Sequence, residues 1–412
     1  MESTEELLLP TTYHLLSTPM ILLAIETSCD ETAVSIVKRV RGKQVRFEVL
    51  SHKVLSQVDL HTQYGGVFPM LAKREHTKAI TQLIAECLHE AELLVERTNT
   101  YHIPNSARKK LDVLLEREPD MRAALQVLFE GIQKPAIDAI AVTEGPGLEP
   151  ALWVGITAAQ ALRTVWDIPV YPINHMEGHI IAGLITLTDD IYEISDMELP
   201  ACALLISGGH TELVHIPKVR SYKVIGKTRD DAVGEAFDKV ARMLSLPYPG
   251  GPEISRLAEY ARKEGLVVDE DLRLPRPMLH SGDLHFSFSG LKTAVLTRIK
   301  KRGELDDRTK RMIALEFENA VTDVLVAKVR QAMYETSAST LIVGGGVSAN
   351  SHIRFALQNL SEQEGFGLFI PNRNLSTDNG IMIASTGLLH LAEGKPSKIK
   401  LEAHGSWSVE HS

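Results

Sequence analysis

Short apolar runs along the chain predict buried strands, and longer stretches with an apolar position every three or four residues predict amphipathic helices. Two similar units stand out, each made of a buried strand, a polar or glycine-containing turn and a second strand. In chain order their segments are Ile21–Ile25, Glu26–Glu31 and Ala33–Val37, then Ala201–Ile206, Ser207–Thr211 and Leu213–Ile216. This recurrence predicts an internal duplication.

Helices and further strands follow both units. Amphipathic spacing predicts helices at 71–88 and 231–244. Two more apolar strands run into glycine turns and then helices, with the strands at 139–142 and 341–343 and the helices at 153–165 and 350–357. We therefore expect an α/β protein of two similar lobes with a nucleotide cleft between them. The expected division is an extension at 1–19, an N-terminal lobe at 20–199 and a C-terminal lobe at 200–412.

Composition narrows the class of protein. The chain has 412 residues, of which 44% are hydrophobic, so it can bury a large core. No apolar run reaches the length of a membrane span. Cys29, Cys87 and Cys202 are too few and too scattered for a disulfide framework, which indicates a reducing compartment. The net charge of −9 argues against general nucleic-acid binding, but the basic segment 292–311 could still form a local surface for RNA.

Two histidines four residues apart, His175 and His179, are candidate metal ligands. On a helix this spacing places both imidazoles on one face, where a single ion can accept both. Asp378, far along the chain, could supply an oxygen ligand from the other lobe. Two or three protein ligands would leave a position open for chemistry. The alternative is a pair of partly buried core histidines.

Glycine-rich turns after predicted strands are candidates for phosphate binding, since their backbone N–H groups and the following helix N-termini attract anions. Three occur in the C-terminal half, at 207–209, 249–252 and 344–350. Each one alone is typical of an ordinary turn. Neither a P-loop nor a Gly-x-Gly-x-x-Gly fingerprint follows a strand, which excludes both of those nucleotide-binding classes.

Three carboxylates are further candidates. Asp238 lies on the polar face of the predicted helix 231–244, where it either faces solvent or, if that helix borders the cleft, accepts hydrogen bonds from a ribose. Asp30 and Glu31 occupy the first turn, where acidic residues are common. In a phosphate cleft they would repel the nucleotide unless a metal ion or water lay between. We therefore predict a catalytic role for them in positioning bound water or the acceptor.

Nine motifs, taken together and in order, resemble the tRNA threonylcarbamoyladenosine transferases, a family once described as O-sialoglycoprotein endopeptidases. The resemblance runs from about residue 20 to about residue 389 and is highly specific. The motifs are Glu26–Thr32, Gly145–Leu148, His175–His179, Leu205–Thr211, Gly234–Lys239, Tyr248–Pro252, Phe286–Lys292, Gly345–Asn350 and Thr377–Asn379.

The resemblance implies an actin-like, sugar-kinase-like fold of two lobes around a nucleotide and metal cleft. It implies transfer of a threonylcarbamoyl group from threonylcarbamoyl-AMP to N6 of the adenosine just 3′ of the anticodon, in tRNAs that read codons beginning with A, with release of AMP. It places one zinc or iron ion on His175, His179 and Asp378. It places the adenylate on Leu205, Ile206, Ser207, Gly208, Gly209, Asp238, Gly251 and Asn350.

Partners follow from the same resemblance. The donor would come from a separate threonylcarbamoyl-AMP synthase, and the anticodon stem-loop of tRNA would be the acceptor. Bacterial relatives use accessory subunits, whereas the mitochondrial branch is expected to act as a homodimer. No membrane partner is expected.

Two positions resemble the bacterial and mitochondrial branch. Leu205 stands where the archaeal and eukaryotic cytosolic branch has a tyrosine ligand, and His210 stands where that branch tends to have asparagine. Residues 92–134 look like an insertion relative to the compact bacterial form, with helices at 107–117 and 121–132 predicted to form a surface hairpin. The insertion favours a protein of the mitochondrial matrix, with the bacterial cytoplasm as the alternative.

Other functions can be distinguished from threonylcarbamoyl transfer. A zinc protease of the His-Glu-x-x-His type is excluded because Glu177 lies one residue, about 100° around a helix, from the general-base position. A small-molecule kinase on the same fold would show steady ATP turnover with a small acceptor. A non-enzymatic, nucleotide-regulated scaffold would keep nucleotide affinity without any group transfer.

Overall fold

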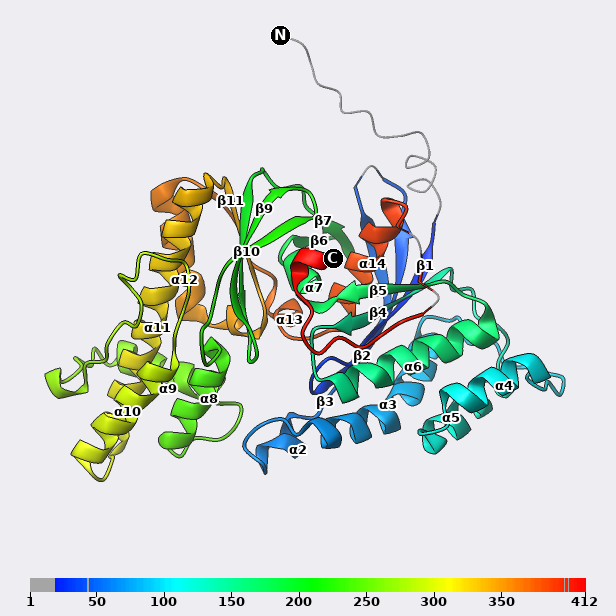
Figure 1. Ribbon diagram of the computed structural model, residues 1–412, viewed down its shortest axis with the longest axis horizontal. Coiled ribbons are helices and arrows are strands. Elements are labelled where there is room, and N and C mark those ends of the chain that lie inside the picture. Colours follow the sequence, from blue (N-terminus) through cyan, green and yellow to red (C-terminus); the bar gives the residue numbers. More distant parts are fainter. Residues whose placement is uncertain (1–18, 43, 396, 399) are drawn as a thin grey trace, which may run out of the picture.

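The computed structural model describes residues 19–42, 44–395, 397–398 and 400–412, and these form two mixed β-sheets flanked by helices (Figure 1). The first sheet has the strand order β5-β4-β1-β2-β3-β7-β6 and the second the order β10-β9-β8-β11-β12. The strands are β1 Ile21–Glu26, β2 Glu31–Val40, β3 Arg46–Ser56, β4 Ala139–Gly145, β5 Val170–Asn174, β6 Ile185–Thr188, β7 Ile191–Ile194, β8 Ala201–Ile206, β9 Thr211–Lys218, β10 Ser221–Lys227, β11 Thr340–Gly344 and β12 Gly367–Phe369.

The two sheets share a core of five strands with the same order and the same directions. In the first sheet β5, β4 and β1 are parallel, and β1, β2 and β3 continue antiparallel. In the second sheet β12, β11 and β8 are parallel, and β8, β9 and β10 continue antiparallel. The predicted duplication is therefore confirmed, and so is the two-lobed, actin-like α/β fold.

Helices cover both sheets, and two of them lie between the sheets. α3 and α6 pack on one face of the first sheet, whereas α7 and α14 occupy the space toward the second sheet (Figure 1). None of the described helices combines the length and the apolarity that a bilayer span needs. The α-helices are α2 Val58–Thr62, α3 Pro69–Glu90, α4 Asn105–Leu114, α5 Pro119–Gly131, α6 Glu149–Trp166, α7 His175–Gly183, α8 Val233–Met243, α9 Gly250–Lys263, α10 Ser289–Arg302, α11 Asp307–Thr336, α12 Ser351–Glu364, α13 Arg373–Ser376 and α14 Gly380–Ala392.

α14 returns the chain to the first sheet. It follows the last strand of the second sheet in sequence, yet it packs against β1, β2 and α7. Its apolar side chains Ile381, Ile383 and Leu388 are buried with those of β1. The lobe limits at 20–199 and 200–412 stay a prediction. They assign α14 to the C-terminal lobe, although α14 packs against the sheet of the first lobe.

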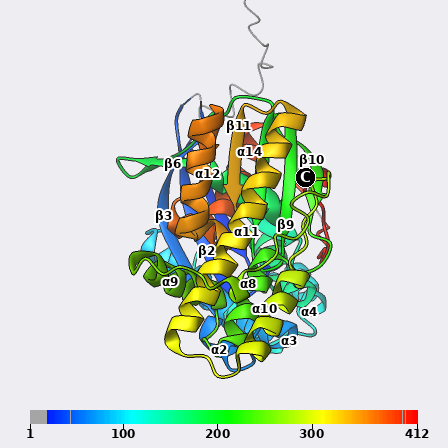
Figure 2. The same ribbon diagram turned by 90° about the vertical axis from the view of Figure 1, so that its left-hand side faces the viewer.

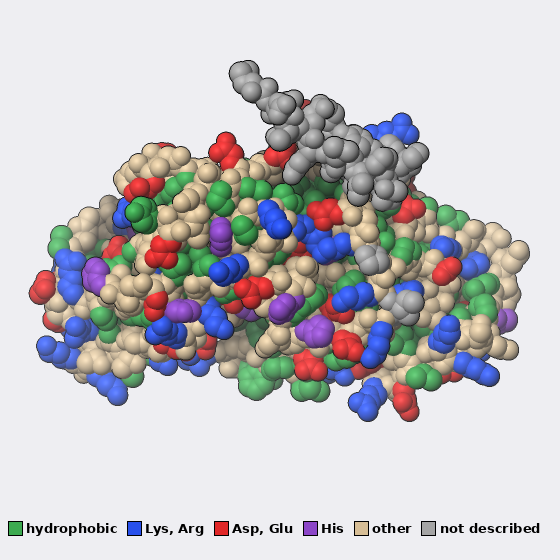
Figure 3. All heavy atoms as spheres, turned by 45° about the horizontal axis from the view of Figure 1, so that its top comes forward, with side chains coloured by type: hydrophobic (Ala, Val, Ile, Leu, Met, Phe, Trp, Pro, Cys, Tyr) green, Lys and Arg blue, Asp and Glu red, His purple; other side chains and the backbone are tan. Residues whose placement is uncertain are grey.

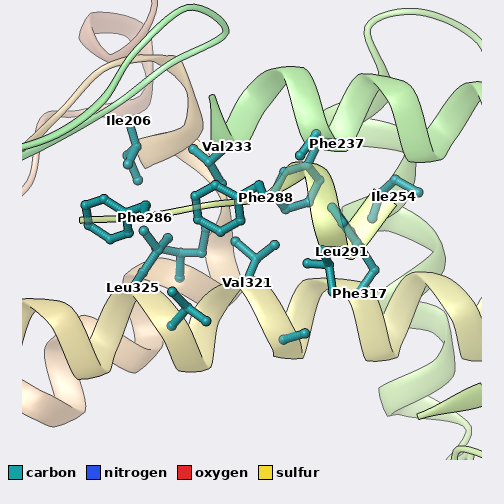
Figure 4. Close-up of a cluster of buried hydrophobic side chains, with 14 of the residues drawn as sticks. Ile206, Val233, Phe237, Ile254, Phe286, Phe288, Leu291, Phe317, Val321 and Leu325 are labelled. Carbon is teal, nitrogen blue, oxygen red and sulfur yellow. The ribbon is translucent and has the colours of Figure 1, made fainter. Parts of the chain in front are cut away.

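Aromatic side chains form the centre of the second lobe (Figure 4). Phe237 of α8 meets Phe317 of α11 edge to face, with ring centroids 5.0 Å apart. Phe286 and Phe288, just before α10, stack with centroids 6.1 Å apart. Full burial of a side chain of this kind contributes about 1.5–3 kcal/mol. The long helix α11, which runs the length of this lobe (Figure 2), thereby fixes the position of α8.

The predicted hairpin near residue 100 is present as α4 and α5, at the end of the first lobe that lies away from the second lobe (Figure 1). The hairpin also packs into the protein, because Leu111, Met121 and Phe129 are buried. Phe129 also meets Trp166 of α6 edge to face, with centroids 5.3 Å apart. The prediction is correct for the position of the hairpin, but the hairpin also extends the core of the first lobe.

The segment after α14 lies across β4 and then reaches the second lobe. Glu144, which is buried in β4, accepts hydrogen bonds from Lys398 Nζ (3.2 Å) and from the backbone N–H of Glu402 (2.9 Å). Further on, the Glu410 carboxylate accepts a hydrogen bond from Val224 N of β10 (2.8 Å). The C-terminal segment therefore ties the first lobe to the edge of the second sheet.

Candidate metal and nucleotide site

The three residues predicted as metal ligands come together between the two sheets. α7 begins at His175 because the Asn174 side chain accepts hydrogen bonds from two backbone N–H groups of the first turn (2.9 and 3.2 Å). Asp378 Oδ1 lies 3.4 Å from His175 Nε2 and 3.1 Å from His179 Nε2. The ligand atoms of all three lie within 4.8 Å of one another, so one ion could bind all three.

The electrostatics of this group favour a cation. Burial alone would lower the pKa of His175, but the carboxylates of Asp378 and Glu26 outweigh it and raise that pKa to about 9. Burial would raise the pKa of Asp378, yet the charges of His175 and His179 hold it well below its usual range. Apart from the approach to Asp378, neither ring nitrogen of buried His179 has a hydrogen-bond partner among the described residues. Two imidazoles and a carboxylate suit zinc or iron, so these residues fit the predicted metal.

Glu26 contacts His175 on the side of the ring opposite to Asp378, a role that we did not predict from the sequence. Its Oε2 lies 3.1 Å from His175 Nδ1, the nitrogen that faces away from Asp378. Thr143 Oγ1 donates to the same oxygen (2.6 Å), and Ser28 N donates to the other one. A carboxylate on the second nitrogen of a ligating histidine fixes the ring and strengthens the ligand. The only signal in the sequence was an acidic residue at the end of an otherwise apolar strand.

Replacing Glu26 with glutamine is expected to weaken metal binding by about 10- to 100-fold, because His175 loses the negative charge that orients and polarises it. Competition with a chromogenic chelator measures this affinity. Glu144→Gln is the matched control, since Glu144 is as buried as Glu26 but its carboxylate contacts Lys398 and Glu402 N and not a histidine ring. Equal affinity in Glu26→Gln and the control would contradict the role of Glu26.

Asp30 and Glu31 lie at the β1–β2 turn, and Glu31 is within electrostatic reach of Asp378. Burial, followed by the charges of Asp30 and Asp378, raises the pKa of Glu31 to about 10. Glu31 thus lies near the metal-ligand group, and the catalytic role of Asp30 and Glu31 stays a prediction.

A buried histidine of α3 holds this turn. The His76 ring lies 3.0 Å from Cys29 O through Nε2 and 2.7 Å from Thr32 Oγ1 through Nδ1. A carbonyl only accepts, so Nε2 carries the proton and Nδ1 accepts from the threonine hydroxyl. Burial lowers the pKa of His76, which agrees with this neutral form. His76 thus fixes both ends of the segment that carries Asp30 and Glu31, and nothing in the local sequence indicated this.

The β8–β9 turn, predicted to bind the adenylate, is closed by its own serine. Ser207 Oγ accepts hydrogen bonds from Gly209 N (3.3 Å) and His210 N (3.1 Å). A side chain added at Gly208 or Gly209 would meet no atom within 4 Å, so this turn borders open space. A ligand can therefore approach the turn at Gly208 and Gly209, although the N–H groups of Ser207, Gly209 and His210 already donate within the turn.

Leu205 and Ile206 are fully buried at the end of β8, so only their backbone groups could reach a ligand. Gly345, with φ of 88°, allows the β11 turn to approach them, because a Cβ there would lie 2.5 Å from Ile206 O. Leu205 offers no ligand atom at the position where another branch of the resembled family has tyrosine.

The remaining predicted residues belong to α8, α9 and the start of α12. Asp238 Oδ1 accepts a hydrogen bond from Gly250 N (2.7 Å), and burial raises the pKa of Asp238. Gly251 borders open space. The Asn350 side chain caps α12 and donates to Glu318 (2.7 Å), so its amide is already engaged within the protein. The roles of these residues toward the adenylate stay predictions.

Glu177 points to the side of α7 away from the histidine pair. Its carboxylate lies 3.1 Å from Arg220 Nε and 2.9 Å from His390 Nε2, and it accepts a hydrogen bond from the Tyr222 hydroxyl (3.2 Å). Burial would raise its pKa, but His390 and Arg220 lower it, so Glu177 is ionised. It is not placed to act as the general base of a zinc protease, in agreement with the exclusion of that class.

Comparison with known proteins decides the family. The family model for tRNA N6-adenosine threonylcarbamoyltransferases matches residues 48–99 and 118–385, more than half of the chain. The chain belongs to this family. A protein of that name from Burkholderia mallei is 42% identical over 379 residues, which cover 90% of this chain and 93% of the relative. A second, from Chromobacterium violaceum, is 41% identical over 382 residues, which cover 92% and 95%. The predicted family and its transferase class are confirmed.

The family model leaves residues 100–117, which include α4, without a match. The insertion expected at about 92–134 stays a prediction.

Solved structures give more distant similarities. HypF in its phosphate- and nucleotide-bound form aligns with a TM-score of 0.49 and 11% identity, over 92% of this chain and 47% of that one. The Lmo2764 protein of Listeria monocytogenes aligns with a TM-score of 0.38 and 11% identity, over 90% and 99%.

Proposed function

We propose that this chain transfers the threonylcarbamoyl group from threonylcarbamoyl-AMP to N6 of the adenosine that follows the anticodon in tRNAs reading codons that begin with A, releasing AMP. The observation that carries the proposal is the convergence of His175, His179 and Asp378 in a chain of this transferase family. The glycine turn lies close to them, since burial and the charges of both histidines lower the pKa of its His210 to about 4.

The ligand-binding roles divide between the lobes. His175, His179 and Asp378 would hold one zinc or iron ion, with Glu26 orienting the first of them. Bound there, the ion would polarise the carbamoyl carbonyl and offset phosphate charge. The turn from 205 to 209 would bind the phosphate on its open side at Gly208 and Gly209, where a ligand can approach the backbone. Asp238, Gly251 and Asn350 would hold the rest of the adenylate.

The reaction joins N6 of the adenosine to the carbamoyl carbon and breaks the bond from that carbon to the phosphate oxygen. AMP leaves with the bonding electron pair, and N6 loses a proton. We assign this proton to the acidic pair Asp30 and Glu31 of the β1–β2 turn, of which Glu31 lies within electrostatic reach of Asp378. The amine of adenine is a poor nucleophile, so the orientation of the two substrates contributes much of the rate.

The test mixes purified protein, freshly prepared threonylcarbamoyl-AMP and unmodified tRNA that reads codons beginning with A. Digestion of the RNA and mass spectrometry then detect threonylcarbamoyladenosine. Product formed by the protein alone supports the proposal and shows that the chain needs no accessory subunit. Absence of product, also after addition of the bacterial accessory proteins, would overturn it. ATP turnover with a small-molecule acceptor would favour a kinase instead.

The basic segment 292–311 is our proposed surface for tRNA phosphates. Lys300, Lys301 and Arg308 are exposed, and none of them forms an ion pair within the described part of the chain. Arg302 is different, because it pairs with Asp269 and Asp271. On the face seen in Figure 3, by comparison, Lys and Arg side chains are interspersed with Asp and Glu, so no basic surface stands out there.

Lys300→Gln combined with Lys301→Gln is expected to weaken tRNA binding and to lower the salt dependence of the affinity, by about 0.7 to 0.9 in the logarithmic slope for each lost phosphate contact. Fluorescence anisotropy at several salt concentrations measures both. Lys109→Gln with Lys110→Gln is the matched control, since these adjacent exposed lysines lie on α4, at the far end of the first lobe. An unchanged slope in the first variant would refute this surface.

The remaining partners and the cellular location are further proposals. A separate threonylcarbamoyl-AMP synthase would supply the donor, and the chain would act as a homodimer. The mitochondrial matrix stays the predicted location, with the bacterial cytoplasm as the alternative; the two relatives described above are bacterial proteins.

A further inference from the structure

Three exposed apolar side chains lie between α2 and the first turn of α3, and we call them the aromatic ledge: Tyr64, Phe68 and Met70, which are 54%, 52% and 67% exposed. The ring centroids of Tyr64 and Phe68 are 5.1 Å apart, with the ring planes tilted by 56°. Large apolar side chains gathered in this way on a protein surface mark an interaction site. No step of the reaction derived above uses them.

Both lobes hold the ledge in place. Thr62 Oγ1 of the first lobe, which donates to Val58 O (2.8 Å), also lies 3.2 Å from Tyr248 O of the second lobe. Arg242 of α8 donates to Gly65 O, in the turn between the two rings. A binding surface fixed in this way loses little conformational freedom when a partner binds. The ledge is therefore preorganised across the junction of the lobes.

The ledge continues directly from the acidic turn of the site. Gln57 N, just before α2, donates a hydrogen bond to Asp30 O (2.9 Å), and α2 leads from there to Tyr64. An adenine whose amine reaches Asp30 and Glu31 must leave the base stack of its RNA loop. The bases next to it then lose a stacking partner.

We propose that Tyr64 and Phe68 provide the stacking surface for an unpaired base of the tRNA anticodon loop, next to the adenosine that is modified. This inference rests on the proposed function. Aromatic side chains stack on every base type, so such a contact suits the varied tRNAs of this class. A protein partner fits less well, because three side chains offer far less than the roughly 800 Å² per partner that a stable protein interface buries.

The experiment measures binding of an unmodified anticodon stem-loop that carries 2-aminopurine on the 3′ side of the target adenosine. Tyr64→Ala with Phe68→Ala is expected to lower the affinity about fivefold or more for each ring removed and to abolish the fluorescence change of the probe. The salt dependence of binding should stay unchanged, because the rings carry no charge. Tyr64→Phe with Phe68→Tyr keeps both rings and should bind like the parent protein.

Tyr334→Ala with Phe355→Ala is the matched control, since it removes one tyrosine and one phenylalanine that are 86% and 61% exposed on α11 and α12. An affinity within twofold of the parent in the Tyr64/Phe68 variant, or the same loss in the control, overturns the ledge while leaving the proposed function intact. If the parent protein does not bind the stem-loop, the proposed function fails and the ledge fails with it. Unchanged metal content shows that the variants are folded.

Discussion

Replacing His175 and His179 together with alanine is expected to remove the bound metal and to lower the rate of threonylcarbamoyl transfer about a thousandfold or more. Both imidazoles approach the same carboxylate oxygen of Asp378, so the double variant leaves one ligand of three. Polarisation of a carbonyl by a metal ion is worth several kcal/mol, and each 1.4 kcal/mol is a factor of ten in rate. Metal content measured by mass spectrometry should fall from about one ion per chain to none.

His89→Ala with His102→Ala provides the control, because both histidines are exposed and lie on the first lobe away from the ligand group. This control should keep its metal and its activity. Thermal unfolding followed by circular dichroism shows whether the double variant of His175 and His179 is still folded. A folded double variant that keeps either the metal or the transferase activity would show that the histidine pair is not the metal site.

Apolar patterning was sufficient to predict most of the strands and helices of this fold. The runs at 21–25 and 201–206 became β1 and β8, which are buried on both faces, so nearly every residue of these runs had to be apolar. The crossing of α14 back to the first sheet could not be predicted in this way. Its sequence shows only that it is apolar all round, and that property does not identify which sheet it covers.

The metal ligands could be predicted because their spacing is local and their motifs resemble a family. The residues that support them could not, because each acts across a long separation in sequence. Glu26 and His175 are in contact although they are 149 positions apart in the sequence, and Glu177 and His390 are 213 positions apart. A buried charge in a strand or helix indicates that a partner exists, since an unpaired buried charge is costly. It does not indicate which residue the partner is.

Replacing Glu177 with alanine is expected to destabilise the protein by about 3–5 kcal/mol, the largest stability effect that we predict. Glu177 is fully buried, accepts from Arg220 and the Tyr222 hydroxyl, and lies 2.9 Å from His390 Nε2, so its removal leaves buried donors without their acceptor. Urea unfolding monitored by fluorescence measures the loss. Metal affinity should fall as well, because these contacts anchor α7, the helix that carries His175 and His179, to β10 and α14.

Two variants separate this effect from a general loss of charge. Glu253→Ala removes a surface carboxylate that pairs with Arg256 on α9, and it should cost no more than about 1 kcal/mol, because exposed pairs contribute little. Glu177→Gln keeps the shape and one acceptor oxygen, so its stability should lie between those of the parent and Glu177→Ala. If Glu177→Ala costs as little as Glu253→Ala, the buried network does not hold α7 in place. The orientation of the histidine pair would then depend on Asn174, on Glu26 and on the packing of α7 against α14 and β11.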